Sequence, residues 1–359
     1  MSFGLLFCIA IPGQHDRLSS LKIKLPTLTL APMQDVTTLA FWHALEPCGG
    51  ADLYVTEYFR VHASSRLEPF ILDSITQNPT GKPVIAQMIG KDIDLLEKAT
   101  RELHNYPIAG IDMNLGCPAP IVCGKDCGGA LLKDPERIRG IVERLRPIVP
   151  GMLTLKTRVG YDSADEFDAL LELFGSLPID GLAIHGRTVK EKYQSLVHTD
   201  KIAQAASCLP FPVTANGSVI SVPSALGMLE KTQASGLMIG RGAIRNPWLF
   251  SQVRQALAGE PVYVPTKADL HAYVCRLIEA VGKTMPKYNE NSLAQRMKRF
   301  MNYVAVGIND GAFLYDIRRI QNPDDFHRVC AEHLSGNDPL SAEPDEAGKL
   351  FCGYRELAG

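Results

Sequence analysis

Residues 109–118 read AGIDMNLGCP, an apolar run that passes directly into a loop with a cysteine close behind an asparagine. Ile111 and Met113 are typical strand residues, whereas Gly116 and Pro118 end strand pairing. The thiol of Cys117 is therefore expected on a loop at the carboxyl end of a buried strand. In α/β proteins that end of the sheet is where catalytic groups usually lie.

The same kind of run recurs along the chain at near-regular intervals. The apolar runs end at polar or turn-forming positions that are 24 to 42 residues apart. Each interval has room for one helix and its loops, which predicts eight parallel strands that alternate with helices. The expected strand ends are Met33, Glu57, Gln87, Asn114, Lys156, His185, Asn216 and Gly240.

The intervening segments have the spacing of amphipathic helices. Ile138, Ile141, Val142 and Leu145 follow an i, i+3, i+4, i+7 pattern, and Asp134 with Pro135 is typical of a helix start. The same spacing recurs in residues 167–174. We therefore predict an α/β fold, a (β/α)₈ TIM barrel, in preference to an open doubly wound sheet, which normally uses fewer strands.

The interval of 42 residues after Asn114 is longer than the others. Its additional segment, residues 119–133, contains Gly124, Gly128 and Gly129. A glycine-bearing loop beside the cysteine suggests a mobile lid, and a tolerated surface insertion is the alternative.

The strand pattern stops after Gly259. Helical segments are expected at residues 270–281, 295–306 and 324–333, which gives four parts: an N-terminal extension (1–26), the barrel (27–259), a small all-helical domain (260–334) and a disordered tail (335–359). Residues 283–319 carry seven basic side chains against three acidic ones. This excess fits either an RNA-binding surface or an ordinary solvated helix face.

Composition excludes several classes of protein. The 359 residues are 46% hydrophobic and 21% charged, with a net charge of −2, so no global nucleic-acid signal exists. No apolar stretch has the roughly 20 residues of a membrane helix, and the N-terminal run lacks the features of a signal peptide. Nine scattered cysteines suggest free thiols in a reducing cytoplasm. The spacing of Cys117, Cys123 and Cys127 matches no zinc or iron–sulfur pattern, so no metal is expected.

In a barrel, polar strand ends meet at one mouth. Asn216-Gly217-Ser218 and Gly240-Arg241-Gly242 end the last two strands, and together they are typical of a phosphate cradle, although either could be only a tight turn. Lys156 could place a fixed cation against a delocalised cofactor, or it could extend to solvent. His185 could take part in the site or be a satisfied core histidine. The expected ring is Gln87, Asn114, Cys117, Lys156, Arg158, His185, Asn216 and Arg241.

These residues resemble the tRNA-dihydrouridine synthase family over about residues 28–330. The motifs that carry the resemblance are, in order, Ala31-Pro32-Met33, Thr56-Glu57, Gln87, Asn114-Leu115-Gly116-Cys117-Pro118, Leu155-Lys156-Thr157-Arg158, His185-Gly186-Arg187-Thr188, Asn216-Gly217 and Met238-Ile239-Gly240-Arg241-Gly242. Tyr58-Phe59-Arg60-Val61 further resembles one bacterial subgroup. Ser218 stands where the family often has an acidic residue.

The resemblance implies an FMN-containing barrel that reduces a D-loop uridine of tRNA to 5,6-dihydrouridine, with NADPH as electron donor. Reduced flavin would pass a hydride from N5 to C6 of the uracil, and Cys117 would give a proton to C5. A cysteine thiol suits that role because it is mostly protonated at neutral pH. Asn114, Arg158 and Arg187 would contact the substrate. The implied flavin contacts are Pro32, Met33, Gln34, Gln87, Lys156, His185, Asn216, Gly217, Ser218, Gly240 and Arg241.

Two alternatives remain at this point. An FMN barrel acting on free dihydropyrimidine or dihydroorotate would share the cysteine loop but would not need a helical RNA-binding domain. A tRNA-binding flavoprotein without catalysis would retain that domain. A monomer in the cytoplasm is expected, and the sequence does not indicate which D-loop uridine is chosen, because the choice depends on how the whole tRNA docks.

Overall fold

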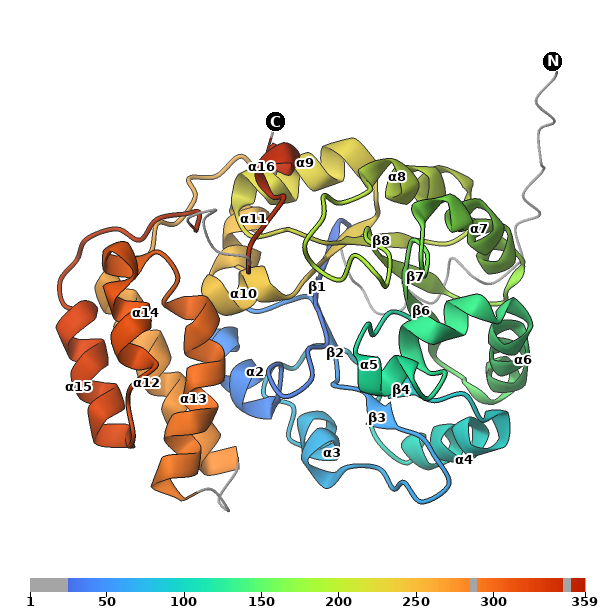
Figure 1. Cartoon of the computed structure of the whole chain (residues 1–359), viewed down its shortest axis with the longest axis horizontal. Coiled ribbons are helices and arrows are strands. Elements are labelled where there is room, and N and C mark those ends of the chain that lie inside the picture. Colours follow the sequence, from blue (N-terminus) through green and yellow to red (C-terminus); the bar gives the residue numbers. More distant parts are fainter. Residues whose placement is uncertain (1–24, 285–288, 345–349, 359) are drawn as a thin grey trace.

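The computed structural model describes residues 25–284, 289–344 and 350–358. Eight parallel strands form a closed barrel, because β2 pairs with both β1 and β4 while β9 pairs with β1 (Figure 1). A ninth short strand, β3, extends beside β4. This confirms the predicted barrel. The strands are β1 (Thr27–Leu30), β2 (Leu53–Val55), β3 (Phe59–Arg60), β4 (Val84–Ile89), β5 (Gly110–Asn114), β6 (Met152–Arg158), β7 (Gly181–His185), β8 (Val213–Asn216) and β9 (Gly236–Ile239).

The strand register brings the predicted polar ends to one mouth. Asn114 of β5 is opposite Lys156 of β6, and His185 of β7 is opposite Asn216 of β8. Arg158, two residues after Lys156, is opposite His185. Since all strands are parallel, these side chains occupy the carboxyl ends of neighbouring strands.

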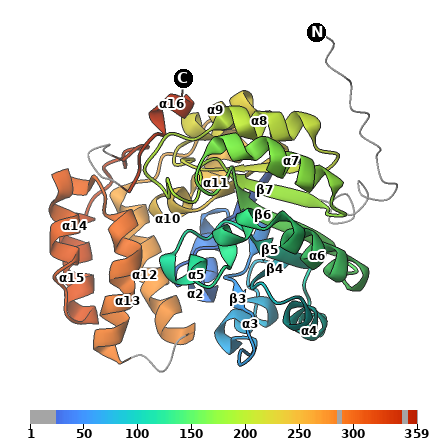
Figure 2. The same cartoon turned by 45° about the vertical axis from the view of Figure 1, so that its right-hand side comes forward.

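Helices surround the barrel on its outer face (Figure 2). Helix α6 shows why they form: Asp134 accepts a hydrogen bond from the backbone N–H of Arg137, Pro135 follows as the first helical residue, and the predicted apolar face is buried. The helices around the barrel are α2 (Leu39–Leu45), α3 (Pro69–Thr76), α4 (Ile93–Leu103), α5 (Pro120–Cys123), α6 (Pro135–Leu145), α7 (Phe167–Ser176), α8 (Thr199–Cys208), α9 (Val222–Thr232), α10 (Arg241–Arg245) and α11 (Leu249–Leu257), with short 3₁₀ turns η1 (Glu46–Cys48), η2 (Gly128–Lys133), η3 (Arg146–Ile148) and η4 (Ala164–Glu166).

The hydrophobic core lies in two layers. The larger layer fills the space between the sheet and the helices. A smaller cluster, which includes Val55, Ile85 and Met238, plugs the inside of the barrel. The plug leaves the mouth as the place for a ligand.

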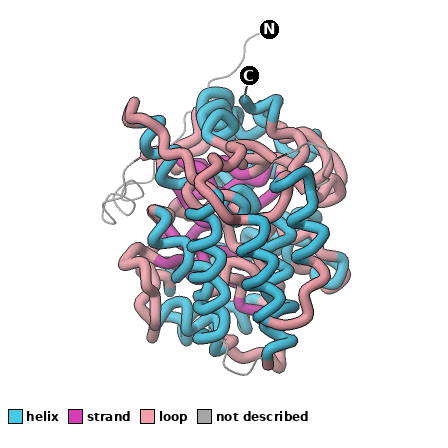
Figure 3. Tube along the Cα trace, turned by 90° about the vertical axis from the view of Figure 1, so that its left-hand side faces the viewer, coloured by secondary structure: helices cyan, strands magenta, loops and turns pink. Residues whose placement is uncertain are grey.

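The C-terminal region is helical, as predicted, and its longer helices stand side by side (Figure 3). Its elements are α12 (Lys267–Thr284), α13 (Glu290–Val304), η5 (Ile308–Gly311), α14 (Ala312–Ile317) and α15 (Pro323–His333). Phe300 of α13 stacks on Phe41 of α2, with ring centroids 6.1 Å apart. None of the described helices is both long enough and apolar enough to cross a bilayer.

The tail differs from the sequence-based expectation of disorder. In its described part, helix α16 (Arg355–Ala358) packs on α9, and Phe351, Tyr354 and Leu357 are buried. These three apolar side chains are spaced three apart, so one face of the segment docks on the barrel. The predicted N-terminal extension lies almost entirely outside the described residues.

Candidate active site

A cavity of about 500 Å³ opens at the mouth of the barrel. This size is typical of a site for a cofactor or small molecule. Most of the predicted site residues lie on its wall, but Gln87 and Arg187 do not. The predicted residues on the wall are Pro32, Met33, Gln34, Asn114, Cys117, Lys156, Arg158, His185, Asn216, Gly217, Ser218, Gly240 and Arg241.

A chain of buried hydrogen bonds fixes the cysteine loop. The side-chain oxygen of Asn114 accepts from the backbone N–H groups of Gly116 and Cys117, at 3.1 and 2.9 Å. The Asn114 amide nitrogen donates to Gln87 at 2.8 Å, and Gln87 in turn donates to Asp112 at 2.7 Å. Asn114 and Gln87 therefore position Cys117 from beneath the cavity.

The predicted lid segment packs directly against Cys117. The backbone N–H of Gly129 donates to the carbonyl of Cys117 at 3.0 Å. Gly128 has a φ of +60° and lies so close to Cys117 that a Cβ there would be 3.0 Å from the cysteine Cβ. Both glycines are needed for this close approach. Motion of the segment stays a prediction.

Tyr58, to which the sequence analysis gave no role in the site, is a neighbour of the thiol. It follows β2 and lines the cavity. Burial raises the pKa of Tyr58 to about 12, and the neighbouring Cys117, which is also its hydrogen-bond partner, adds to this rise. The phenol therefore stays protonated beside the thiol across the physiological range.

Lys156 and His185 form the opposite wall. The ammonium of Lys156 donates to the side-chain oxygen of Asn216 at 3.3 Å. Burial, followed by the charge of Arg158, lowers the pKa of Lys156 to about 8. Burial and the nearby cations hold the pKa of His185 well below its usual range, so its imidazole is neutral. The His185 Nδ1 atom is buried and has no hydrogen-bond partner among the described residues.

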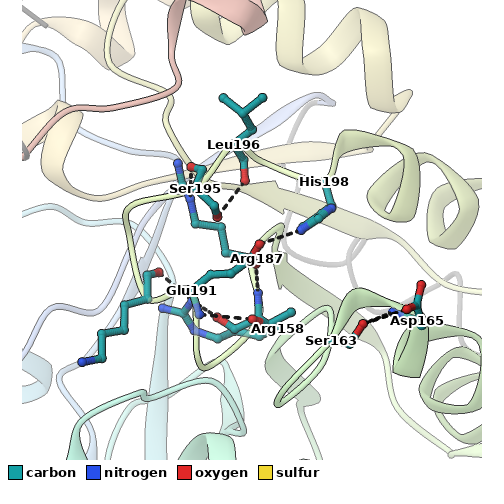
Figure 4. A network of polar contacts seen from close by, with 10 residues as sticks. Arg158, Ser163, Asp165, Arg187, Glu191, Ser195, Leu196 and His198 are labelled. Carbon is teal, nitrogen blue, oxygen red and sulfur yellow. Dashed lines mark hydrogen bonds and ion pairs between the residues drawn. The ribbon is translucent and has the colours of Figure 1, made fainter.

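Arg158 and Arg187 bind main-chain carbonyls (Figure 4). The guanidinium of Arg158 donates to Gly116 at 2.7 Å and to Lys192 at 2.8 Å, while it still borders the cavity. Arg187 is fully buried and donates to the carbonyl of Ser195 at 2.7 Å. Both arginines therefore shape the loop at residues 187–198, and the predicted substrate contact of Arg187 would need that loop to rearrange.

The charge balance of the cavity calls for an anion. Arg158, Arg187 and Arg241 form no ion pair with a carboxylate within the described part of the chain. Burial and the charge of Arg241 lower the pKa of Arg187 to about 10. Its Nη1 atom has no hydrogen-bond partner among the described residues and lies 3.8 Å from where a Cβ on Gly217 would be. A phosphate in the cradle at Gly217 would supply the missing negative charge, so the donor set fits FMN.

Further wall residues come from distant parts of the chain. Tyr193 lies under two guanidinium groups, with Arg241 4.9 Å and Arg158 5.2 Å from its ring centre. Tyr303 of α13 and Leu350 of the tail also border the cavity. No local pattern marks these residues, because a tyrosine or leucine in a loop or helix has no distinctive spacing.

The model of the family described as dihydrouridine synthase (Dus) matches residues 29–335. The chain belongs to this family. Its members are enzymes, and the match includes every element of the mouth described above except Leu350.

Individual relatives agree with this assignment. The tRNA-dihydrouridine(16) synthase of Neisseria meningitidis serogroup B strain MC58 is 30% identical over 85% of this chain and 94% of its own length. The protein of the same name from Haemophilus ducreyi is 29% identical over 88% and 97%. The tRNA-dihydrouridine synthase B of Pseudomonas syringae pv. tomato is 33% identical over 64% and 68%.

Solved structures share the fold. Histamine dehydrogenase from Rhizobium sp. 4-9 superposes with a TM-score of 0.52 at 10% identity, covering 87% of this chain and 62% of the other. A 2-naphthoyl-CoA reductase complex gives 0.51 at 11% identity, covering 89% and 69%. At such low identity these likenesses concern the barrel architecture alone.

Proposed function

We propose that this protein reduces uridine 16 of tRNA to 5,6-dihydrouridine with FMN as its cofactor and NADPH as the electron donor. The observation that carries the proposal is the position of Cys117 on the wall of a cavity whose buried arginines have no carboxylate partner among the described residues. The choice of position 16 is supported by the names of the relatives from Neisseria and Haemophilus.

Residues on the two sides of the mouth would hold different parts of the cofactor. Gly217, Ser218, Gly240 and Arg241 would hold the phosphate. Pro32, Met33 and Gln34 would line the flavin with main-chain groups, and Lys156 and His185 would face its ring. A neutral His185 can donate one hydrogen bond from its buried imidazole, and Lys156 can stabilise negative charge on the ring.

Cys117 is the proton donor in this proposal. Bound reduced flavin would supply a hydride to C6 of the uracil. Cys117 then gives its thiol proton to C5 from the opposite face, and Asn114 keeps the thiol loop in place during this transfer. Tyr58 keeps its own proton next to the sulfur, so it can stabilise the thiolate that results.

The helical region would hold the tRNA while the uridine is turned out of the RNA fold into the cavity. Arg318 and Arg319 are exposed, and Arg319 lies over the ring of the exposed Tyr315, 3.2 Å from its centre. Such a group can contact phosphates and stacked bases. Arg296, by contrast, is buried in an ion pair with Asp35, so it adds little to an exposed basic surface.

The remaining expectations concern the setting of the enzyme. Among the described residues, six cysteines are free thiols, which supports a reducing compartment such as the cytoplasm: Cys48, Cys117, Cys123, Cys127, Cys275 and Cys330. We infer that the protein acts there as a monomer.

The test is dihydrouridine formation on unmodified tRNA by the purified protein with FMN and NADPH, with the product position mapped along the tRNA. We compare wild type with Cys117→Ala and with Cys208→Ala, a matched control at an exposed cysteine on α8. A general acid typically contributes about 10²- to 10⁴-fold, so Cys117→Ala should lose activity on that scale while the control keeps it.

Several results would contradict the proposal. Product at another D-loop position would refute the choice of uridine 16 alone. Full activity of Cys117→Ala would refute its role as proton donor. Reduction of free uracil or orotate derivatives without any action on tRNA would favour a free-pyrimidine enzyme instead.

A further inference from the structure

The C-terminal strap, defined here as residues 350–358, lies beyond the family match, which ends at residue 335. It crosses the barrel beside α9 and α10, and its end is the short helix α16 (Figures 1 and 2). Phe351, Tyr354 and Leu357 anchor it, with exposed fractions of 2%, 0% and 3%. The ring of Phe351 meets the edge of Tyr303, 6.4 Å between centres. Three buried side chains therefore anchor the strap to the barrel.

Two carbonyls of the strap accept hydrogen bonds from side chains around the phosphate cradle. The carbonyl of Cys352 accepts from the Ser218 hydroxyl at 2.9 Å and from Nη2 of Arg187 at 3.3 Å. The carbonyl of Leu350 accepts from Arg241, and Leu350 itself borders the cavity. The thiol of Cys352 donates to the carbonyl of Tyr193 at 3.0 Å. Three side chains around the cradle are thus held by strap carbonyls.

We propose that the strap is part of the cofactor site, where it fixes Arg187, Ser218 and Arg241 around the cradle and slows the release of FMN. This inference rests on the proposed function, because it takes FMN to be the ligand of the cavity.

Carbonyl partners suit this role better than carboxylates would. A carbonyl accepts a hydrogen bond from a guanidinium but leaves its positive charge uncancelled. The strap therefore orders two buried arginines without neutralising them, and the phosphate meets donors that are already in position. A carboxylate at the same place would compete with the phosphate for the arginines.

The strap also closes the site sterically. Gly353 has a φ of +70°, and a Cβ there would lie 3.5 Å from Nη2 of Arg187 and 3.3 Å from Leu196. The strap thus covers the loop at residues 187–198 from outside, together with the buried face of Arg187. Departure of the phosphate end would require this covered loop to open.

Two variants detach the strap in different ways. The first ends the chain after Pro344. The second is Gly227→Ala on α9, where a Cβ would come within 1.6 Å of the carbonyl oxygen of Leu357. Alanine favours a helix more than glycine does, so this substitution should leave α9 folded while it displaces α16. Gly175→Ala on α7 is the matched control, because a Cβ there makes only an ordinary contact with Leu209 at 3.5 Å.

The measurement is the affinity and release rate of flavin, followed by its fluorescence on binding to the flavin-free protein, for FMN and for riboflavin. Loss of one charge-assisted hydrogen bond costs about tenfold or more in binding. We therefore expect both strap variants to release FMN at least about tenfold faster than wild type. Riboflavin lacks the phosphate, so its affinity should change less than about twofold in these variants, and the Gly175→Ala control should match wild type for both ligands.

Each other outcome overturns the inference. Unchanged FMN release in both variants would mean that the strap does not belong to the cofactor site. Equal losses for FMN and riboflavin would indicate general damage to the barrel, and tighter FMN binding would mean that the strap competes with the phosphate. Failure of the wild type to bind FMN at all would instead refute the proposed function, and the inference with it.

Discussion

The two ends of the barrel differ in how the charge of their buried arginines is balanced. At the amino-terminal end, Arg146 and Asp180 form an ion pair at 2.6 Å, with the carboxylate only 3% exposed. At the mouth, Arg158, Arg187 and Arg241 donate to main-chain carbonyls and have no carboxylate partner in the described chain. A buried cation that is paired within the chain makes the fold depend on its partner, whereas one that is left unbalanced indicates that a ligand brings the counter-charge.

The largest expected effect is at the paired end. Asp180→Ala should remove the carboxylate of this buried ion pair and should lower the free energy of unfolding by about 3–5 kcal/mol. Urea denaturation of the flavin-free protein measures this. Asp168→Ala is the control, because its ion pair with Lys201 has a carboxylate that is 69% exposed, and should cost no more than about 1 kcal/mol. Equal, small losses would contradict the contrast.

At the mouth, removal of a cation should weaken ligand binding rather than destabilise the fold. Arg241→Met removes a charge that has no partner carboxylate in the part of the chain that the structure describes, so the flavin-free protein should keep its stability within about 1 kcal/mol. FMN binding should weaken by about 10- to 100-fold, since a hydrogen bond between charged groups is worth about 1.5–3 kcal/mol. Flavin fluorescence titration with denaturation on the same preparation separates the two effects. A lower free energy of unfolding together with unchanged FMN affinity in Arg241→Met would contradict the contrast between the two ends of the barrel.

The stability of the protein should depend on pH through Lys156 at the mouth. Burial lowers its folded pKa to about 8, below the value of about 10.4 for an unfolded lysine. Between these values the unfolded chain binds one more proton than the folded chain, so stability should rise with pH. The free energy of unfolding of the flavin-free wild type, measured relative to that of Lys156→Met, should rise between about pH 8 and pH 10. A difference that is flat or that falls with pH would show that the ammonium is not buried as described.

The smallest effect is expected at Tyr58, whose neutral phenol lies beside Cys117. Tyr58→Phe removes the phenol beside Cys117 while the ring stays in place. Loss of one neutral hydrogen bond of about 1 kcal/mol predicts a fall in turnover of about fivefold, without a change in FMN affinity. Single-turnover oxidation of the reduced enzyme by tRNA measures it. A loss as large as that of Cys117→Ala would make Tyr58 a proton donor in its own right.

Much of this site could be predicted because a parallel barrel brings strand ends together. Asn114, Lys156, His185 and Asn216 each follow an apolar run, and the register places them side by side. Gln87 was expected at the flavin, but it lies beneath the cavity because its amide is used by Asp112 and Asn114. Side-chain partners of this kind are not visible in a linear pattern.

The rest of the site depends on contacts between distant segments. Arg187 is buried because Cys352, 165 positions later, covers it, and Tyr303 reaches the cavity from the helical region. The tail was misjudged from its polar composition. The spacing of Phe351, Tyr354 and Leu357 was the available signal for a docked segment.

The loop that would carry the flavin has its own counter-ions in the helical region. Asp35 has a φ of +62° and pairs with Arg296 at 3.6 Å and with Arg299 at 3.4 Å, both on α13. Burial and the charge of Asp35 also raise the pKa of nearby Glu57 to about 7. The helical region is consequently not an interchangeable module: a chimera that takes its barrel from this protein and its helices from a relative would have to carry both arginines across, or leave two acidic groups facing each other beneath the flavin loop.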